Sequence, residues 1–470
     1  MTSYRIERDT LGDVRVPADA LYGAQTQRAV ENYPISGLRE HPAFVHAFIV
    51  LKKAAALANR ELGTIEPRLA DPILAACDRI LGDLDGYRRH FVIDVFQAGA
   101  GTSFNMNCNE VIANLANAAL GGELGVYKPI HPNDHVNMSQ STNDVVPTAI
   151  RVSTVHLLDK LIPAVERLAK AFDEKGDQFA DVIKSGRTHL QDAVPITLGQ
   201  EFAAYAAAVR RSNRLLYDAS TELFELGIGG TAVGTGINTP PGYRYVVVRH
   251  LNEILGASKL FRSAEDLREA MQSQLPVVAV SAALRNLALE LTRITNDLRL
   301  LASGPHTGLA EIILPAVQPG SSIMPGKVNP SMLECMNQVL FHVIGADTAV
   351  AYASQAGQLD LNVMMPLMAF EIAFSIEILK NFLPVLTERC IRGIEADRAR
   401  CEAYYISSPS LATALNPIIG YAAAAEIAKE SAKSGKPIPD LLRERNLLPE
   451  EKIREIFTPE FLAGQADRKA

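Results

Sequence analysis

The stretch VVAVSAALRNLALELTRITNDLRLL, residues 277–301, carries the strongest structural pattern in the chain. Its apolar residues recur at alternating steps of three and four, which is the spacing of one face of an α-helix. The positions on this face are Val277, Val280, Leu284, Leu287, Leu291, Ile294, Leu298 and Leu301. A helix over the whole stretch would extend about 37 Å at the standard rise. The pattern therefore predicts one long helix, which Gly304 and Pro305 end.

Two further segments show similar spacing with less regularity. One extends from about Ala149 to Ile183, and the other from Leu198 to Leu223. Long helices of this kind bury their apolar stripes against each other. We therefore expect an all-α fold, with an elongated central helical bundle and smaller N- and C-terminal helical domains. The expected domains are residues 1–140, 141–395 and 396–470.

The composition limits the class of protein. The chain has 470 residues, of which 48% are hydrophobic and 21% charged, as in a soluble globular protein with a large core. Its net charge is −7 and it has no long run of Lys or Arg, which argues against nucleic acid and acidic membranes as partners. The five cysteines are scattered, and the N-terminus lacks the apolar core of a secretory signal. We expect a cytoplasmic protein with reduced thiols.

The segment PGSSIMPGKVNP, residues 319–330, predicts a loop because its glycines and prolines interrupt regular structure. Ser321, Ser322, Lys327 and Asn329 are donors that could hold an anion. A mobile connector is the alternative, since the same residue types are ordinary in linkers. A nucleotide-binding P-loop does not fit, because Val328 stands where the magnesium-binding hydroxyl belongs.

Three other segments are equally rich in donors: NMSQSTND (137–144), SGRTHLQDAVP (185–195) and GAGTSFNMNCNE (99–110). Helix capping or ordinary loop structure would explain each of them taken singly. A lone histidine such as His189 is more often a structural group than a catalyst. His131 and His135 have a spacing that suits a metal on a helix, yet Pro132 argues against a helix there. We expect no metal site and no cofactor.

Together, GSSIMPGKVNP, NMSQSTND, GRTHLQDAVPITLGQEF and GAGTSFNMN resemble the signatures of the aspartase/fumarase superfamily. The resemblance extends from RIERDTLGDVRVP near the N-terminus to LNPIIGY at 415–421, which is nearly the whole chain. It implies an all-α homotetramer whose central helices form a common core. It also implies active sites where loops of three subunits meet around a small dicarboxylate substrate.

The reaction that the resemblance implies is β-elimination through an aci-carboxylate, giving fumarate or a fumaryl product. Ser321 matches the general base of the superfamily, and His189 and Asn143 match residues near the leaving group. The superfamily residues that bind the carboxylate taking up the negative charge are matched by Thr102, Ser141, Thr142 and Ser322. The superfamily residues that bind the other carboxylate of the substrate are matched by Thr188, Lys327 and Asn329.

The substrate is the finer question. QSTND (140–144), RSAEDLREA (262–270), NDLRLLASGP (296–305) and AGQLDLNVMMP (356–366) are more similar to the ammonia-lyase branch than to class II fumarases. Met365 and His306 depart from that branch, where an acidic residue and an arginine are usual. We expect reversible elimination of ammonia from L-aspartate. A class II fumarase is the alternative, and a non-catalytic structural homologue is disfavoured because Ser321, Lys327 and His189 are all present.

Overall fold

The structure, a computed structural model, describes residues 3–256 and 260–463. Helices dominate these residues, and their strands form small two-stranded sheets. The chain divides into two compact units. Unit 1 contains the residues up to Ile162, Leu215–Asn286 and Phe341–Leu379, and unit 2 contains Pro163–Arg214, Leu287–Leu340 and the residues from Lys380 onward. The mostly helical fold is confirmed, whereas the division into three domains stays a prediction.

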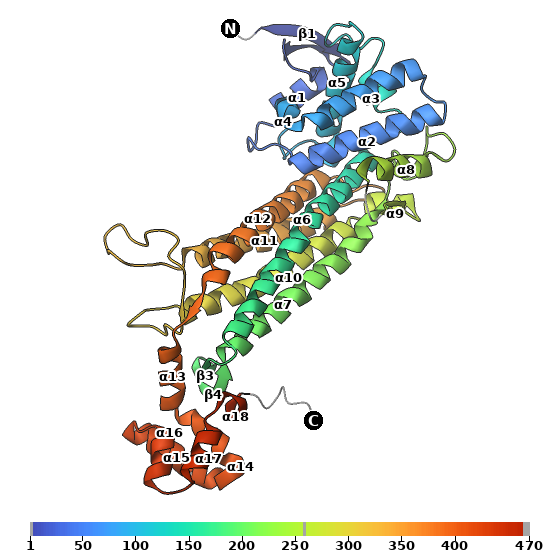
Figure 1. Ribbon diagram of the computed structural model, residues 1–470. Coiled ribbons are helices and arrows are strands. Elements are labelled where there is room, and N and C mark those ends of the chain that lie inside the picture. Colours follow the sequence, from blue (N-terminus) through green and yellow to red (C-terminus); the bar gives the residue numbers. More distant parts are fainter. Residues whose placement is uncertain (1–2, 257–259, 464–470) are drawn as a thin grey trace. The chain divides into compact units, whose positions relative to one another are not determined.

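Five long helices contribute residues to both units, and Figure 1 labels them. They are α6 (Thr142–Gln178), α7 (Leu198–Ser220), α10 (Leu275–Leu301), α11 (Ser331–Gln355) and α12 (Met365–Arg389). The helix predicted from the spacing at 277–301 is confirmed as α10. The helix predicted from Ala149 to Ile183 is wrong at both ends, because α6 begins in the polar STND segment and Ile183 belongs to a strand.

The apolar face of α10 is buried along its full length, since none of its eight positions is more than 7% exposed. Within the described residues, α10 is also the one helix that is long and apolar enough to cross a membrane. A core helix of a helical bundle meets the same criterion, and burial of the face is what a bundle requires. The cytoplasmic location stays a prediction.

Unit 1 holds the N-terminal elements and the glycine-rich segment that follows α7. Its strands are β1 (Tyr4–Asp9), β2 (Gly12–Pro17), β5 (Glu225–Leu226) and β6 (Arg262–Ser263); β1 and β2 pair antiparallel, β5 and β6 parallel. Its own α-helices are α1 (Ala24–Asn32), α2 (Pro42–Glu61), α3 (Pro67–Gly82), α4 (Leu84–Tyr87), α5 (Thr102–Ala119), α8 (Tyr243–Leu255) and α9 (Leu267–Gln272). Short turns of other helix types lie at Arg88–His90, Gly99–Gly101, Pro132–Val136 and Thr221–Phe224.

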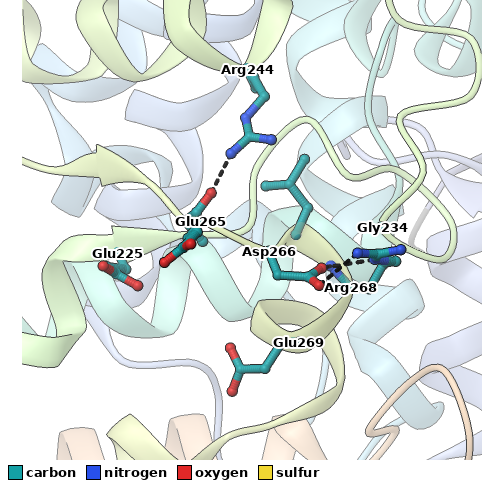
Figure 2. Close-up of a pocket in the computed structure, with 9 residues that line it drawn as sticks. Glu225, Gly234, Arg244, Glu265, Asp266, Arg268 and Glu269 are labelled. Atoms are coloured by element: carbon teal, nitrogen blue, oxygen red, sulfur yellow. Dashed lines mark hydrogen bonds and ion pairs between the residues drawn. The ribbon is translucent and has the colours of Figure 1, made fainter.

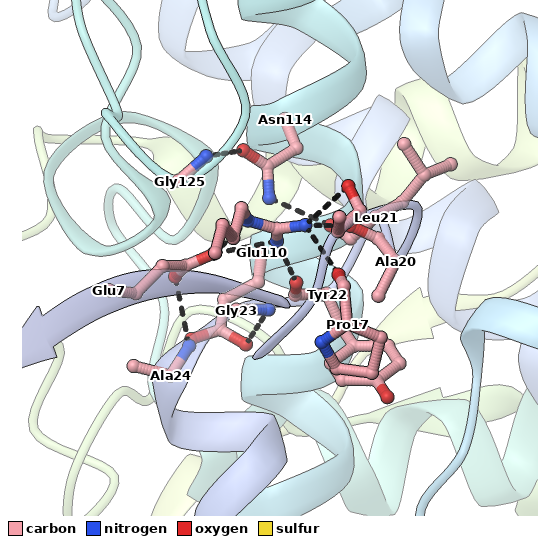
Figure 3. Close-up of polar contacts among 12 residues, drawn as sticks. Glu7, Pro17, Ala20, Leu21, Tyr22, Gly23, Ala24, Glu110, Asn114 and Gly125 are labelled. Carbon is pink, nitrogen blue, oxygen red and sulfur yellow. Dashed lines mark hydrogen bonds and ion pairs between the residues drawn. The ribbon is translucent and has the colours of Figure 1, made fainter. Parts of the chain in front are cut away.

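Polar contacts fix α5 within unit 1. The Glu110 carboxylate on α5 accepts hydrogen bonds from the N–H groups of Gly23 and Thr26 at the start of α1. Asn114, one turn further along α5, donates to the carbonyl of Leu21 and accepts from Gly125, as Figure 3 shows. A carboxylate at a helix N-terminus satisfies N–H groups that have no partner within the helix. The position of α5 is therefore set by bonds to segments distant in sequence.

The segment His131–His135 differs from the prediction. Pro132 was expected to exclude a helix, yet Pro132–Val136 forms one turn of π-helix with the proline at its first position. Proline is tolerated there because its missing N–H would have had no partner within the helix. His131 Nδ1 accepts from the N–H groups of Asn133 and Asp134, and His135 Nδ1 accepts from the N–H of His131. Both imidazoles thus serve the local turn.

Unit 2 holds the remaining elements. Its strands are β3 (Ile183–Thr188), β4 (Gln191–Thr197), β7 (Ile312–Ile313) and β8 (Glu395–Ala396), in two antiparallel pairs. Its own α-helices are α13 (Arg398–Ser407), α14 (Asn416–Ile419), α15 (Tyr421–Ser434), α16 (Ile438–Glu444), α17 (Glu450–Ile456) and α18 (Pro459–Leu462), with 3₁₀ turns at Ile391–Gly393 and Pro409–Leu415. The donor-rich segment 185–195 is therefore a β-hairpin, a structure that we did not predict.

Candidate active site

The start of α6 carries three of the predicted site residues. The Ser141 N–H donates to Asp144 Oδ1 over 2.9 Å, and the Asn143 N–H donates to Ser141 Oγ over 3.2 Å. These reciprocal bonds cap the helix, as the capping interpretation of STND predicted. Capping also fixes the orientation of Ser141, so the structural role and a role in binding are compatible.

Asp144 also ties α6 to the glycine-rich segment of unit 1. Its Oδ2 accepts from the N–H groups of Gly229 and Thr231 at 3.0 and 2.9 Å. Asn143 Nδ2 donates to the carbonyl of Ala232 over 2.8 Å. Asp144 is fully buried, and burial raises the pKa of its carboxyl to about 6. The N–H groups of Gly229 and Thr231 thus hold the first turn of α6 in place through Asp144.

Thr142 connects the first turn of α6 to α5. Asn105 Nδ2 donates to Thr142 Oγ1 over 2.9 Å, and Thr102 lies one helical turn before Asn105. Thr102 is exposed at the start of α5. The N-termini of two helices thus meet here, and both carry partial positive charge. Thr102, Ser141 and Thr142 form a hydroxyl-bearing region suited to a carboxylate.

The asparagines at 105, 107 and 109 differ from the prediction, which placed them in loops or caps. They lie inside α5 and are almost fully buried. Asn107 accepts from Val92 N–H and donates to the carbonyl of His90, while Asn109 donates to Asn137. Polar side chains are tolerated within a buried helix where distant groups satisfy their hydrogen bonds.

Lys52 is a member of this region that the sequence did not identify. It lies on α2 with 0% exposure, and its ammonium donates to side-chain oxygens of Asn105, Asn137 and Gln140 at 2.7, 3.0 and 3.0 Å. Burial lowers the pKa of Lys52 to about 8. Lys52 follows Phe48 by one helical turn and so lies on the buried face of α2. This place in the apolar pattern is the sequence feature that could have identified it. We name Lys52, Asn105, Ser141, Thr142 and Asp144 the α5–α6 cradle.

Unit 2 places Thr188 and His189 at the tip of the β3–β4 hairpin. Both side chains are exposed, and the turn residues His189 and Leu190 have φ values of +55° and +59°. Two successive residues with positive φ match the twist of a tight hairpin but strain residues other than glycine. His189 is therefore presented at the surface of the unit.

A buried ion cluster anchors this hairpin to the segment before the 319–330 loop. Glu311, with a side chain 0% exposed, accepts from both terminal nitrogens of Arg187 at 2.9 Å. Lys184 lies 3.2 Å from the same carboxylate and 2.7 Å from Glu201. Sequence reasoning missed Glu311, because its partners are more than a hundred residues away in the chain. The cluster joins strand β3 of the hairpin to Glu311, the residue that precedes β7.

The 319–330 segment is a loop, as predicted, and it bonds chiefly to itself. Ser321 Oγ accepts from the N–H groups of Ile323 and Met324 at 3.2 and 3.0 Å. Asn329 Nδ2 donates to the carbonyl of Gly320, so this predicted donor already serves to close the loop. A Cβ at Gly320 would meet the carbonyl oxygen of Lys327 at 2.1 Å, so the closure requires glycine. Ser322 and Lys327 are exposed.

Unit 1 contains a pocket of about 600 Å³. None of the predicted site residues lines it. Figure 2 shows its carboxylates, including Glu265 and Glu269, and its two arginines. Arg268 pairs with Asp266, and Arg244 donates to Ser263 and to the carbonyl of Ala264. Because four carboxylates and only two arginines line this pocket, it is a poor site for a dicarboxylate.

The two departures from the ammonia-lyase pattern lie in different surroundings. Met365 is the first residue of α12 and is 0% exposed, so an apolar side chain suits its position. His306 is exposed after the end of α10. Nothing in the structure explains why histidine stands there.

Comparison with known proteins agrees with the resemblance. Residues 12–345 match a family described as lyase, and residues 411–464 match the fumarase C C-terminus. An aspartate ammonia-lyase from Bacillus sp is 47% identical over all of both chains, and one from Pseudomonas aeruginosa is 49% identical over 98% of this chain and 97% of its own.

Solved structures agree as well. One described as fumarate lyase:delta crystallin from Brucella melitensis has a TM-score of 0.93 and 47% identity, covering 97% of this chain and 99% of its own. The class II fumarase from Schistosoma mansoni also has a TM-score of 0.93, with 33% identity over 98% of this chain and all of its own. The chain therefore belongs to the aspartase/fumarase superfamily of lyases.

Proposed function

We propose that the protein is an aspartate ammonia-lyase, which converts L-aspartate reversibly to fumarate and ammonia. The observation that carries this function is the full-length identity of 47 and 49% to two aspartate ammonia-lyases, against 33% to the class II fumarase of similar fold. Met365 is buried at the start of α12, where an apolar side chain fits.

The reaction begins with removal of a proton from the carbon next to the β-carboxylate. The electrons of the C–H bond pass into that carboxylate, which becomes a doubly charged aci-carboxylate. They then form the double bond as the C–N bond breaks and ammonia leaves. Stabilising the aci-carboxylate is the main energetic problem, and preorganised donors address it.

Ser321 is the base in this proposal. A serine hydroxyl is a weak acid, so its alkoxide needs stabilisation before it can take a proton from carbon. The two backbone N–H groups that donate to Ser321 Oγ support this role, because they would bond more strongly to an alkoxide. Lys327 adds positive charge to the same loop.

The carboxylates are held by two sets of donors. Thr102, Ser141, Thr142 and Ser322 bind the carboxylate that takes up charge, and Thr188, Lys327 and Asn329 bind the other. The meeting of two helix N-termini at Thr142 supports the first assignment. Asn329 Nδ2 uses one of its two N–H groups to close its loop, and the second can donate to this carboxylate. Asn143 and His189 lie near the departing ammonia.

An assay with purified protein tests the function. L-aspartate and L-malate are supplied separately, and fumarate is followed by its ultraviolet absorbance. The reverse reaction starts from fumarate, with ammonium chloride or in plain buffer, and aspartate and malate are quantified. Aspartate turnover at least tenfold above malate turnover supports the proposal. Malate formation with no detectable aspartate would transfer the assignment to class II fumarase.

The protein also acts as a homotetramer in this proposal, with active sites shared between subunits. Large apolar side chains are exposed on long helices: Phe341 and Tyr352 of unit 1 are 56 and 66% exposed, and Leu289 of unit 2 is 51% exposed. Exposed apolar groups on bundle helices favour burial against another copy. Sedimentation equilibrium measures the state directly, and a fully active monomer would contradict it.

A further inference from the structure

Lys52 is a buried cation that the reaction steps above do not use. Its ammonium has three N–H groups, and side-chain amide oxygens of Asn105, Asn137 and Gln140 accept from it. These acceptors are neutral, so the positive charge of Lys52 is not cancelled by a directly bonded carboxylate. A buried cation whose direct hydrogen-bond partners are all neutral is costly to a fold, although the nearby Asp144 carboxylate offsets part of that cost. We therefore ask which nearby function the buried charge of Lys52 could serve.

The contacts of Lys52 lead to the predicted carboxylate grip. Lys52 Nζ donates to Asn105 Oδ1, and the other end of the same amide, Nδ2, donates to Thr142 Oγ1. Because Thr142 Oγ1 accepts from Asn105, its own hydrogen remains available to donate elsewhere. A hydrogen-bonded chain of this kind polarises each donor in it. It ends on the hydroxyl that would face the substrate.

We propose that Lys52 is a positioning residue that stabilises the aci-carboxylate through Asn105 and Thr142. This inference rests on the proposed function and extends it to a residue outside the substrate's direct contacts. The intermediate carries one more negative charge on this carboxylate than the substrate does. A fixed buried cation therefore favours the intermediate over the substrate, and such a difference lowers the barrier.

The groups that face Lys52 are compatible with this role. Those that act on it electrostatically are Asp144 of α6 and the thiols of Cys77 on α3 and Cys108 on α5. Burial raises the pKa of both thiols far above neutrality, so they carry no charge at pH 7. Asp144 directs its oxygens to backbone N–H groups. The lowered pKa of Lys52, about 8, leaves it mostly protonated at neutral pH.

The experiment compares two inhibitors by calorimetry at pH 7. Succinate resembles a substrate dicarboxylate, whereas the nitronate of 3-nitropropionate, added preformed, reproduces the planar, double-bonded form of the aci-carboxylate with a formal negative charge on each of its two oxygens. For Lys52→Met we expect nitronate affinity to fall at least about tenfold more than succinate affinity, and kcat to fall about 10- to 100-fold with KM within threefold. Lys53→Met is the matched control, since Lys53 is the neighbouring, partly exposed lysine that pairs with Asp78.

Two further variants keep the test decisive if Lys52→Met does not fold. Lys52→Gln retains a donor without the charge, and Asn105→Ala keeps the charge but breaks the chain to Thr142. Both should lower the preference for nitronate over succinate. Equal weakening of both inhibitors in the folded variants would assign Lys52 a purely structural role and overturn the inference. Calorimetry needs no turnover, so absence of aspartate cleavage by the wild type would refute the proposed function separately.

Discussion

The α5–α6 cradle in unit 1 and the 319–330 loop in unit 2 carry candidate site residues in opposite ways. In the cradle, Lys52, Asn105 and Asp144 are at most 1% exposed, and segments distant in sequence hold them. In the loop, the bonds of Ser321 and Asn329 are local, and Ile323 is 83% exposed. The first arrangement depends on packing, and the second on turn chemistry.

Preorganisation has a different physical origin in each region. Buried donors with fixed partners need no rearrangement when charge develops nearby, which suits a grip on a changing carboxylate. An exposed loop held by its own backbone can present a base to a substrate that enters from solvent.

Replacement of Ser321 by alanine should abolish most turnover. We expect kcat for aspartate to fall at least about 100-fold, because the base is lost, while succinate affinity stays within several-fold. Steady-state kinetics and inhibition by succinate measure the two effects. Ser407→Ala, at an exposed serine of α13, is the control. Near-normal turnover in Ser321→Ala would show that Ser321 is not the general base.

Replacement of Glu311 by glutamine should destabilise unit 2. The variant leaves Arg187 and Lys184 without their shared buried carboxylate, so we expect the free energy of unfolding to fall by about 2–3 kcal/mol. Urea unfolding followed by circular dichroism measures it.

The control for that measurement is Glu388→Gln, which removes an exposed pairing with Arg392 and should change stability by less than about 1 kcal/mol. A Glu311→Gln protein as stable as this control would show that the hairpin does not need the ion cluster.

The raised pKa of Asp144 predicts that the stability of the folded protein depends on pH. Its pKa is raised to about 6 in the folded state by burial, above the value near 4 of an unfolded chain. The folded state therefore binds more protons between these pH values, and the contribution of Asp144 to stability falls as pH rises from about 4 to 6.

The measurement compares wild type with Asp144→Asn, which does not titrate. The difference in free energy of unfolding, wild type minus variant, should decrease by about 1–3 kcal/mol from pH 4.5 to pH 7. Ser407→Ala, in which no titratable group changes, is the control and should show no such trend. A constant difference for Asp144→Asn would mean that its carboxyl is not perturbed.

Replacement of Leu190 by glycine should stabilise the β3–β4 hairpin slightly. Leu190 is 72% exposed with φ at +59°, a conformation that glycine adopts without strain. We expect a gain of about 0.5–1 kcal/mol in the free energy of unfolding. Leu11, exposed in the β1–β2 turn but without positive φ, is the matched position, and Leu11→Gly should not stabilise.

Local sequence was enough to predict α10 and the loop at 319–330. The spacing of α10 is a local property, because residues three and four apart share a face whatever surrounds them. Glycine and proline in the loop act on their own backbone, so their effect is local too. The capping of α6 by Ser141 was also open to prediction, since its partner is two residues away.

The roles of Lys52, Asn105 and Glu311 became visible only in the folded structure. Their partners lie in distant segments, so nothing in their immediate sequence separates a buried, bonded polar group from a solvated one. The same reason explains why the asparagines of α5 suggested a loop: alone they disfavour a helix, and only bonds from other segments make their burial stable. The hairpin at 185–195 likewise depends on pairing and on Glu311, which lies more than a hundred residues further along the chain.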